Sequence, residues 1–388
     1  MSGRAPLTDP WRLGSLEVPN RVLLAPLAGI GNWFVRLQAK RYGAGMAVSE
    51  MVSSHAIHYR NERTCTEMLR IHPEERGSSS GRSTPEDERA SWHQRGTSCS
   101  ERVSGAPIPG GPVCIQLFGE DPAIMCSAAA HLAAHTDADA IDINMGCPVP
   151  KVRRTGAGAG MLANPDLAVA IARAAREGAV EAGRELPVTV KLRSGLTPGD
   201  TAGYELAHRL VAEAGVAAIG FHPRPAAVHH KGVPDYALAA RLVSELDAPV
   251  ILTGGLHDAP STLGAYERTG AAAVMLARGA LGNPWLFAQL LGARDPEDRP
   301  TRAEVLDELD WTIDCAVEHL GEARATRYLR KFYPWYVTRL DLDHAIARRL
   351  NEALLRADTL SAARDLLETC APRYTGPLAA PIQPAVPA

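Results

Sequence analysis

The sequence predicts an α/β fold, a (β/α)8 TIM barrel followed by a small C-terminal all-helical domain. Three observations lead to this fold class. Eight short apolar runs recur along the chain, and each is followed by a turn and a helical pattern. After about Pro300, helical spacing continues without further strands. The glycine fingerprint of an open dinucleotide-binding sheet is missing from the sequence.

The eight runs have the length and the continuous apolar character of strands in a parallel sheet that is covered on both faces. They lie at residues 21–25, 46–50, 113–118, 140–144, 187–192, 217–222, 249–253 and 272–277. Helical segments such as 166–182 and 201–214 separate them. Eight such units favour a closed barrel over an open doubly wound sheet. The glycine cluster at 156–160 follows a basic stretch instead of a strand and has the wrong spacing for a dinucleotide site.

The domain organisation follows from changes in composition. We expect a barrel domain over residues 1–292 and a helical domain over 300–372. Residues 75–112 form an insertion in the barrel in which 18 of 38 residues are Gly, Ser or Pro, and this composition predicts disorder. The insertion follows the second strand, so we expect it near the active face. Residues 373–388 are rich in Pro and Ala, which predicts a disordered tail.

Composition excludes several classes of function. The 388 residues carry 41 Lys and Arg against 44 Asp and Glu, a net charge of −3, so the protein is no uniformly basic nucleic-acid coat. A local basic patch remains open. The sequence contains neither a signal-peptide pattern nor a run of 18 apolar residues. Seven cysteines without a C-x-x-C pair indicate free thiols and no metal site. We expect a cytoplasmic monomer with no membrane partner.

Barrels carry their ligands at the carboxyl ends of the strands, and polar or glycine residues end nearly every predicted strand. Gly254 and Gly255 follow the seventh run, and Arg278 with Gly279 follows the eighth. Backbone N–H groups in these two turns commonly bind phosphate, and an arginine adds a fixed positive charge. This pattern predicts a phosphate-bearing ligand. Ordinary turn chemistry is the alternative interpretation.

Two further strand residues indicate which phosphate-bearing ligand this is. The Gln116 amide offers donors and an acceptor, which suits the edge of a pyrimidine-like ring. Lys191 would bring a positive charge into the barrel mouth, where it favours an anionic reduced flavin. Together with the phosphate site, these residues predict a flavin mononucleotide (FMN) pocket. Alternatively, Lys191 pairs with Glu50 and is structural.

Cys147 lies in a Gly-Cys-Pro turn directly after the fourth run. The proline fixes the direction of the turn, and a thiol at the catalytic face can donate a proton. Nearby Lys151, Arg153 and Arg154 leave its protonation state open. A packed structural cysteine is the alternative.

An ordered series of motifs resembles the tRNA-dihydrouridine synthase family, most closely its bacterial B-type branch. The motifs are LLAPLAGI (23–30), VSEMVSS (48–54), QLFG (116–119), DINMGCP (142–148), VKLRSG (190–195), the His-x-Arg at 222–224 and ARGALGNPW (277–285). DINMGCP is the most specific of them. The resemblance runs from about residue 15 to 292 and resumes at RKFYPWY (330–336) in the helical domain.

The resemblance implies an FMN enzyme that reduces the C5–C6 double bond of uridines in tRNA, with NADPH or NADH as electron donor. Cys147 would protonate C5. The residues it implies for FMN binding are Pro26, Leu27, Ala28, Gln116, Lys191, His222, Thr253, Gly254, Gly255, Ala277 and Arg278. Those it implies for orienting the uridine are Asn144, Lys151 and Arg224.

The sequence departs from the family pattern after the seventh strand, where Thr253-Gly254-Gly255 stands in place of the usual Asn-Gly-Asp. Side-chain contacts to FMN are in doubt there, whereas backbone contacts could survive. Two alternatives therefore stay open. One is another FMN barrel, such as a dihydroorotate dehydrogenase-like enzyme acting on a small molecule, and the other is a non-catalytic tRNA-binding protein.

The helical domain carries a basic and aromatic stretch. Residues 321–340 contain five cations and one acid, together with Tyr328, Phe332, Tyr333, Trp335 and Tyr336. Such interleaving suits phosphate contacts and base stacking, so we expect this domain to bind tRNA. The alternative is that the aromatic residues form the helical core.

Overall fold

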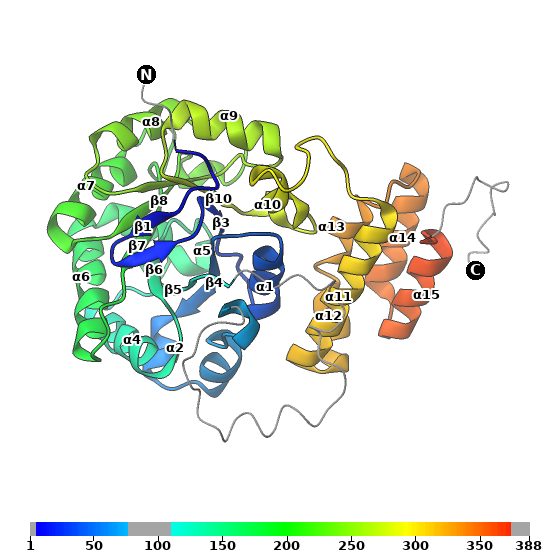
Figure 1. Cartoon of the computed structure of the whole chain (residues 1–388). Helices are drawn as coiled ribbons and strands as arrows, with labels where there is room; N and C mark the ends of the chain where they lie inside the picture. The colour runs from blue at the N-terminus through cyan, green and yellow to red at the C-terminus, as the bar shows by residue number, and fades with distance from the viewer. Residues whose placement is uncertain (1–4, 77–109, 374–388) are drawn as a thin grey trace. The chain divides into compact units, whose positions relative to one another are not determined.

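The computed structural model describes residues 5–76 and 110–373. The chain forms two compact units (Figure 1). The first unit holds the described residues up to Ala280 together with Pro284–Pro296. The second unit holds Leu281–Asn283 and the described residues from Glu297 onward. The first unit carries the strands, and the elements of the second are helices.

The first unit is a closed barrel of eight parallel strands, which confirms the predicted fold class. The strands are β3 (Val22–Leu24), β4 (Met46–Ser53), β5 (Val113–Phe118), β6 (Ala140–Met145), β7 (Val188–Arg193), β8 (Ala218–His222), β9 (Val250–Thr253) and β10 (Ala273–Leu276). β10 pairs with β3 and closes the barrel. Each strand lies within or overlaps one of the eight apolar runs.

Helices surround the barrel between the strands (Figure 1). They are α1 (Trp33–Arg41), α2 (Ser54–His58), α4 (Pro122–His135), α5 (Pro150–Arg153), α6 (Pro165–Glu181), α7 (Ala202–Ala214), α8 (Tyr236–Glu245), α9 (Ala259–Thr269) and α10 (Trp285–Leu290). Local sequence sets their ends. Asp121 and Asp258, for example, cap the first turns of α4 and α9, each of which has a proline there. α7 ends at Gly215 in the left-handed conformation that glycine adopts without strain.

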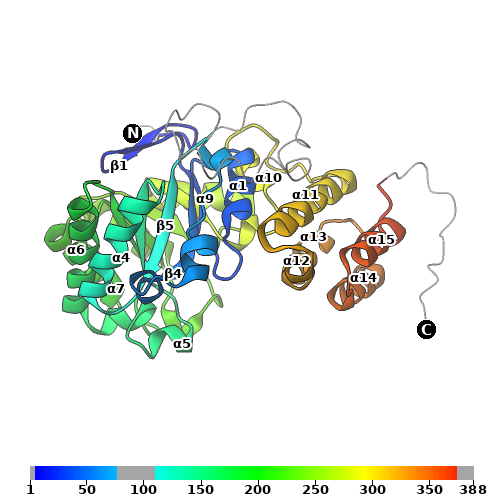
Figure 2. The ribbon, with the colours of Figure 1, turned by 90° about the horizontal axis from the view of Figure 1, so that it is seen from below.

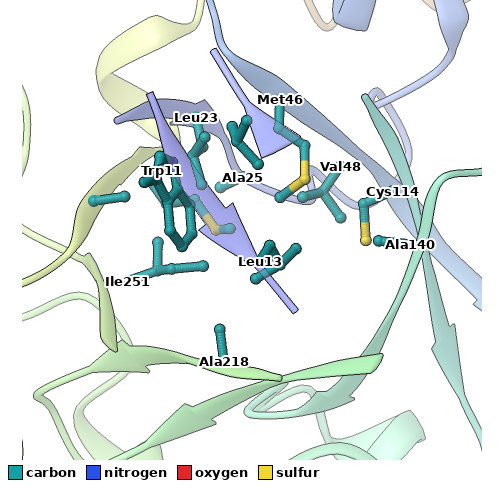
Figure 3. Close-up of a cluster of buried hydrophobic side chains, with 13 residues drawn as sticks. Trp11, Leu13, Leu23, Ala25, Met46, Val48, Cys114, Ala140, Ala218 and Ile251 are labelled. Atoms are coloured by element: carbon teal, nitrogen blue, oxygen red, sulfur yellow. The ribbon is translucent and has the colours of Figure 1, made fainter. Parts of the chain in front are cut away.

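An N-terminal hairpin, which the sequence did not reveal, closes the amino end of the barrel. Its strands β1 (Trp11–Leu13) and β2 (Leu16–Val18) pair antiparallel around a two-residue turn. Figure 3 shows Trp11 and Leu13 packed among the first residues of the barrel strands, and Figure 2 shows β1 and α5 at opposite ends of the barrel. Strands of three residues are too short to show a periodic pattern. Because the hairpin fills the amino end, the carboxyl end remains for a ligand.

The expected insertion, residues 75–112, is described only at its two ends, and residues 77–109 lie outside the described residues. The predicted disorder is wrong for the two described ends, residues 75–76 and 110–112, which are ordered. The Glu75 carboxylate is buried and accepts hydrogen bonds from Arg36 at 2.8 and 2.9 Å. Such a charge-assisted bidentate pair holds the segment against α1.

The insertion also begins and ends at a different place from the one expected. Arg76 pairs with Asp139, directly before β6, at 3.1 Å. Gly111 lies just before β5 and donates its N–H to the Glu75 carbonyl at 3.3 Å. Both anchors therefore lie at the amino ends of β5 and β6, opposite the active face. The chain returns to the amino end before the insertion begins, because the segment after β4 runs back through α2 and the 3-10 helix Pro73–Arg76.

The second unit consists of α11 (Arg302–Leu320), α12 (Glu322–Leu329), α13 (Tyr333–Val337), α14 (His344–Arg356) and α15 (Leu360–Cys370). Thr301 and Glu304 form a capping box at the start of α11. α14 and α15 lie side by side in both ribbon views (Figures 1 and 2).

Three aromatic residues of the 321–340 stretch belong to the core of this unit. Phe332, Tyr333 and Tyr336 are at most 3% exposed. The Tyr336 hydroxyl lies 2.9 Å from that of Thr312 on α11. The core interpretation is therefore correct for these three, and Tyr328 and Trp335 are only half-buried.

In the part of the chain that the structure describes, no helix has both the length and the apolar character needed to cross a membrane. Free thiols are present at Cys65, Cys114, Cys126, Cys147 and Cys370. Cys315 is buried in α11.

Candidate active site

The structure brings the predicted site residues to one end of the barrel. Alternate residues of each strand point inward, and the last inward positions reach the carboxyl end. Most of the predicted residues lie on or directly after β3, β5, β6, β7, β8, β9 and β10. Lys151 lies on the short helix α5 that follows the Cys147 turn, and it is exposed.

Three neighbouring strands carry a buried polar layer across the barrel interior. Gln116, Asp142 and Thr189 are direct register partners on β5, β6 and β7. Gln116 Nε2 donates to Asp142 Oδ2 at 2.6 Å, and Thr189 Oγ1 donates to Asp142 Oδ1 at 2.6 Å. Both carboxylate oxygens are therefore satisfied within the protein. Sequence reasoning selected Gln116 but missed the other two, although Asp142 has the same inward spacing as Asn144.

Asn144 joins this layer to the Cys147 turn. Its Nδ2 donates to Gln116 Oε1 at 2.9 Å. Its Oδ1 accepts the backbone N–H groups of Gly146 and Cys147 at 3.2 and 2.9 Å. One amide side chain thus connects the barrel interior to the turn that carries the thiol.

The glycine cluster at 156–160 supports the same turn from the other side. Ala159 donates its N–H to the Cys147 carbonyl at 3.0 Å. A Cβ on Gly158 would lie 3.0 Å from that carbonyl oxygen, and φ at Gly158 is +59°. Glycine is therefore required there. The cluster has no part in a dinucleotide site and holds the cysteine in place.

Lys191 is half-buried on β7, and its side-chain amine forms no hydrogen bond within the described residues. Burial and then Arg193 lower the pKa of Lys191 to about 8, while the charges of Asp142 and Cys147 oppose this change. Lys191 is the register partner of Asn144 on β6, the residue that holds the Cys147 turn. Glu50, the alternative partner of Lys191, accepts the backbone N–H of Gly29 at 2.8 Å.

A group of cations surrounds the ends of β7, β8 and β10. Burial and then Arg278, Arg193 and Arg224 lower the pKa of His230 to about 4. Burial and nearby cations likewise hold the pKa of His222 well below its usual value. Arg224 is 5% exposed, and its Nε has no hydrogen-bond partner. Unneutralised positive charge of this kind fits an anionic ligand. Sequence reasoning did not select Arg193 or His230.

The turns after β9 and β10 bring the backbone close to this cationic group. φ is +95° at Gly254 and +81° at Gly255. A Cβ on Gly254 would lie 2.2 Å from the His222 ring, and one on Gly279 would lie 2.3 Å from the Leu256 carbonyl. Only glycine fits these positions. Thr253, at the end of β9, is 2% exposed.

The turn after β3 completes the carboxyl end of the barrel. The Leu27 carbonyl accepts the N–H groups of Ile30 and Gly31 at 3.1 and 2.7 Å, so Pro26–Ala28 is held in a tight turn. Leu27 is buried, and Ala28 is exposed. Ala277 and Arg278 follow β10, which pairs with β3, and Arg278 is exposed.

Polar groups that converge on the carboxyl end of a closed parallel barrel are typical of (β/α)8 enzymes, which bind their ligands at that end. Within that class, residues 23–372 match the family model described as Dihydrouridine synthase (Dus). The match covers most of the chain, which therefore belongs to the dihydrouridine synthase family.

Individual relatives agree with the family model. A probable tRNA-dihydrouridine synthase of Rhodobacter capsulatus is 33% identical over 361 residues, which are 92% of this chain and 96% of that protein. One of Mycobacterium tuberculosis is 32% identical over 87% of this chain and 80% of its own length. A tRNA-dihydrouridine synthase B of Xanthomonas axonopodis is 29% identical over 90% of this chain and 92% of its own length.

Solved structures show the same fold at low sequence identity. Histamine dehydrogenase from Rhizobium sp. 4-9 matches 74% of this chain and 48% of its own, with a TM-score of 0.50 and 14% identity. A 2-naphthoyl-CoA reductase matches 75% of this chain and 53% of its own, with a TM-score of 0.50 and 15% identity. At these identities the likeness concerns the fold alone.

Proposed function

We propose that this chain is an FMN-dependent tRNA-dihydrouridine synthase, which reduces the C5–C6 double bond of uridines in tRNA with NADPH or NADH as electron donor. Membership of the family supports the reaction class. The observation that carries the proposal is that Asn144 bonds both to Gln116 and to the Cys147 turn, while its register partner on the neighbouring strand is Lys191. A proton donor, a cation and an amide that can recognise a ring edge thus share one end of the barrel.

The residues at this end fit a flavin mononucleotide. The Lys191 amine has no hydrogen-bond partner among the described residues and would lie against the electron-rich edge of the ring. Arg278 and the surrounding arginines would neutralise a phosphate, and the uncharged His222 ring would contribute at most a hydrogen bond. When bound, the flavin would supply the hydride that reduces the uracil. The residues proposed to hold it are Pro26, Leu27, Ala28, Gln116, Lys191, His222, Thr253, Gly254, Gly255, Ala277 and Arg278.

The departure at Thr253-Gly254-Gly255 is compatible with this role. The Thr253 side chain is buried, and the two glycines adopt positive φ values. Their backbone groups would make the contacts to the ribityl phosphate that relatives obtain in part from side chains. Arg278 adds a charge that this backbone lacks.

Cys147 is the proposed general acid. Its Sγ would deliver a proton to C5 of the uracil, from a turn that Asn144 holds in place. Asn144, Lys151 and Arg224 would orient the base. A uracil in folded tRNA reaches such a site only when it is turned out of its stack, so the barrel end has to accept a single extruded nucleotide.

The second unit is the proposed tRNA-binding domain. The exposed cations on or beside α12 and α14 are Arg324, Arg327, Lys331, Arg348, Arg349 and Arg356. The acids of α11 are partly neutralised within the unit, because Arg364 of α15 pairs with Asp314 at 2.7 Å and with Asp310 at 3.4 Å. Phosphate contacts by cations would therefore dominate, and Tyr328 and Trp335 are the remaining candidates for base stacking. Monomeric state and cytoplasmic location stay predictions.

Two measurements test the proposal. The purified protein should show a flavin spectrum, or should gain one on addition of FMN, and a protein that stays colourless after reconstitution contradicts the cofactor. tRNA from a deletion strain should lose dihydrouridine at one or more positions by mass spectrometry. Restoration from a plasmid, with no restoration by the Cys147→Ala variant, assigns the loss to this site and its general acid. Consumption of a free pyrimidine in place of tRNA would favour the dihydroorotate dehydrogenase-like alternative.

A further inference from the structure

Asp142 is a buried carboxylate for which the proposed reaction has no use. It lies in the middle of β6 and is 3% exposed. Burial raises the pKa of Asp142 to about 6, and hydrogen bonds from Thr189 and Gln116 together with the charge of Lys191 limit this rise. The two oxygens of Asp142 each accept a hydrogen bond at 2.6 Å, one from Gln116 Nε2 and one from the Thr189 hydroxyl. A carboxylate engaged in this way acts as an acceptor only.

The acceptor-only carboxylate gives direction to a chain of amides. Nε2 is the only end of the Gln116 amide that can face Asp142, so Oε1 faces the other way, toward Asn144 Nδ2. Asn144 Oδ1 then faces the backbone N–H groups of the cysteine turn. The backbone N–H groups fix the direction of the chain at the Asn144 end, and the carboxylate fixes it at the Gln116 end. Neither amide can therefore reverse without losing a hydrogen bond.

The hydrogen bonds of Gln116 define what its side chain still offers a ligand. An amide has two N–H donors and two acceptor positions. Asp142 uses one donor and Asn144 uses one acceptor position, which leaves one of each. A donor beside an acceptor is complementary to the N–H and C=O groups on the pyrimidine edge of a flavin.

We propose that Asp142 is a positioning residue for flavin recognition, which fixes the direction of the Gln116 amide so that one donor and one acceptor remain for the pyrimidine edge. This inference rests on the proposed function and adds a residue to its cofactor site. Asp142 itself would touch neither flavin nor substrate and would act through Gln116.

The experiment is a double-mutant cycle on the affinity of the apoprotein for FMN, measured by the quenching of flavin fluorescence. Asp142→Leu removes the acceptor from Gln116 at similar side-chain volume, and Gln116→Ala removes the group on which Asp142 acts. Loss of a buried partner should weaken FMN binding by about tenfold or more in Asp142→Leu. In the Gln116→Ala background the same substitution should change the affinity by less than about twofold.

Two further variants separate positioning from a general structural role. Asp142→Asn can still present an oxygen to Gln116 and its NH₂ to the Thr189 hydroxyl, so it should keep FMN affinity within about threefold. Thr189→Val removes the other partner of the carboxylate without touching the Gln116 bond, and should have a similarly small effect. Far-UV circular dichroism and thermal unfolding establish that each variant is folded. If Asp142→Leu does not fold, the cycle uses Asp142→Ala.

The outcomes distinguish this inference from the function on which it rests. Failure of the unaltered protein to bind FMN overturns the proposed cofactor. With normal binding by the unaltered protein, an equal loss on Asp142→Leu in both backgrounds shows that Asp142 does not act through Gln116 and overturns the positioning role. If Asp142→Asn loses as much FMN affinity as Asp142→Leu, the positioning role is also overturned. Such a result would mean that the charge of Asp142 matters, and not the acceptor that it presents to Gln116.

Discussion

The side-chain oxygen of Asn144 accepts the backbone N–H of Cys147 at 2.9 Å, while the Cys147 carbonyl accepts the N–H of Ala159 at 3.0 Å. The cysteine is thus held on both sides, by a barrel residue and by the 3-10 helix Gly158–Ala163. A thiol fixed in this way can serve as a directed proton donor, because a general acid works only from a defined position.

Replacement of Cys147 should separate cofactor binding from turnover. We expect Cys147→Ala to bind FMN normally and to form dihydrouridine at least about a hundredfold more slowly, the usual contribution of a general acid. Single-turnover assays with reduced, FMN-loaded protein measure the chemical step. Cys126→Ala is the matched control, because this half-buried thiol lies on α4 away from the site, and it should leave the rate unchanged. Equal rates in all three proteins would remove Cys147 from the reaction.

The affinity for FMN should fall as the pH rises through about 8. Burial lowers the pKa of Lys191 to about 8 in the free protein. An anionic ligand beside the amine raises that pKa again, so binding takes up a proton above pH 8, and affinity falls there by up to about tenfold per pH unit. Fluorescence titrations between pH 6.5 and 9.5 measure this. Lys191→Met should bind more weakly at pH 7 and lose this dependence, whereas an unchanged slope in the variant would place the titrating group elsewhere.

Gly254 should resist substitution for two physical reasons. Its φ of +95° strains any residue with a Cβ, and that atom would lie 2.2 Å from the His222 ring. We expect Gly254→Ala to lower the free energy of unfolding by about 1–2 kcal/mol or more and to weaken FMN binding. Gly264→Ala is the control, since Gly264 lies in α9 with no atom within 4 Å of the added Cβ, and should stabilise by up to about 1 kcal/mol. Urea unfolding measures the change in unfolding free energy for both variants. Destabilisation by both, or stabilisation by both, would contradict this explanation of Gly254.

The Arg36–Glu75 pair should contribute strongly to the stability of the barrel unit. Both side chains are fully buried, so removal of one charge leaves the other without its bidentate partner, and Glu75 would keep only the His72 N–H and the charge of Lys40. Arg36→Met or Glu75→Gln should cost about 3–5 kcal/mol in urea unfolding. The exposed pair Arg63–Glu67, 3.2 Å apart, provides the comparison, and Arg63→Met should cost less than about 1 kcal/mol. Similar losses of unfolding free energy at the two pairs would mean that burial does not strengthen the contribution of the Arg36–Glu75 pair to stability.

Much of the fold could be predicted from the sequence, because the barrel strands are continuous apolar runs and their order fixes the topology. The ends of those runs also indicated the predicted site, from Gln116 on β5 to Arg278 after β10. These predictions needed only the position of a residue along its own strand. The structure places most of these residues at one end of the barrel, and their roles stay predictions.

Asp142 and Thr189 could not be found in this way, because their importance depends on the register between strands. Asp142 lies inside the apolar run 140–144, and only the pairing of β5, β6 and β7 brings Gln116 and Thr189 to its two oxygens. Glu75 was misjudged for a related reason. Local composition around it suggests disorder, and its partner Arg36 lies 39 residues earlier in the chain.

The central claim is that this site reduces uridine in tRNA, and the most direct measurement is dihydrouridine formed by the purified protein. An unmodified tRNA transcript is incubated with FMN-loaded protein and NADPH, and its nucleosides are quantified by mass spectrometry. We expect dihydrouridine at a defined position, in amounts that match the NADPH oxidised, and almost none with Cys147→Ala. NADPH oxidation by a flavin-loaded protein that leaves every uridine of a panel of tRNAs unchanged would contradict it.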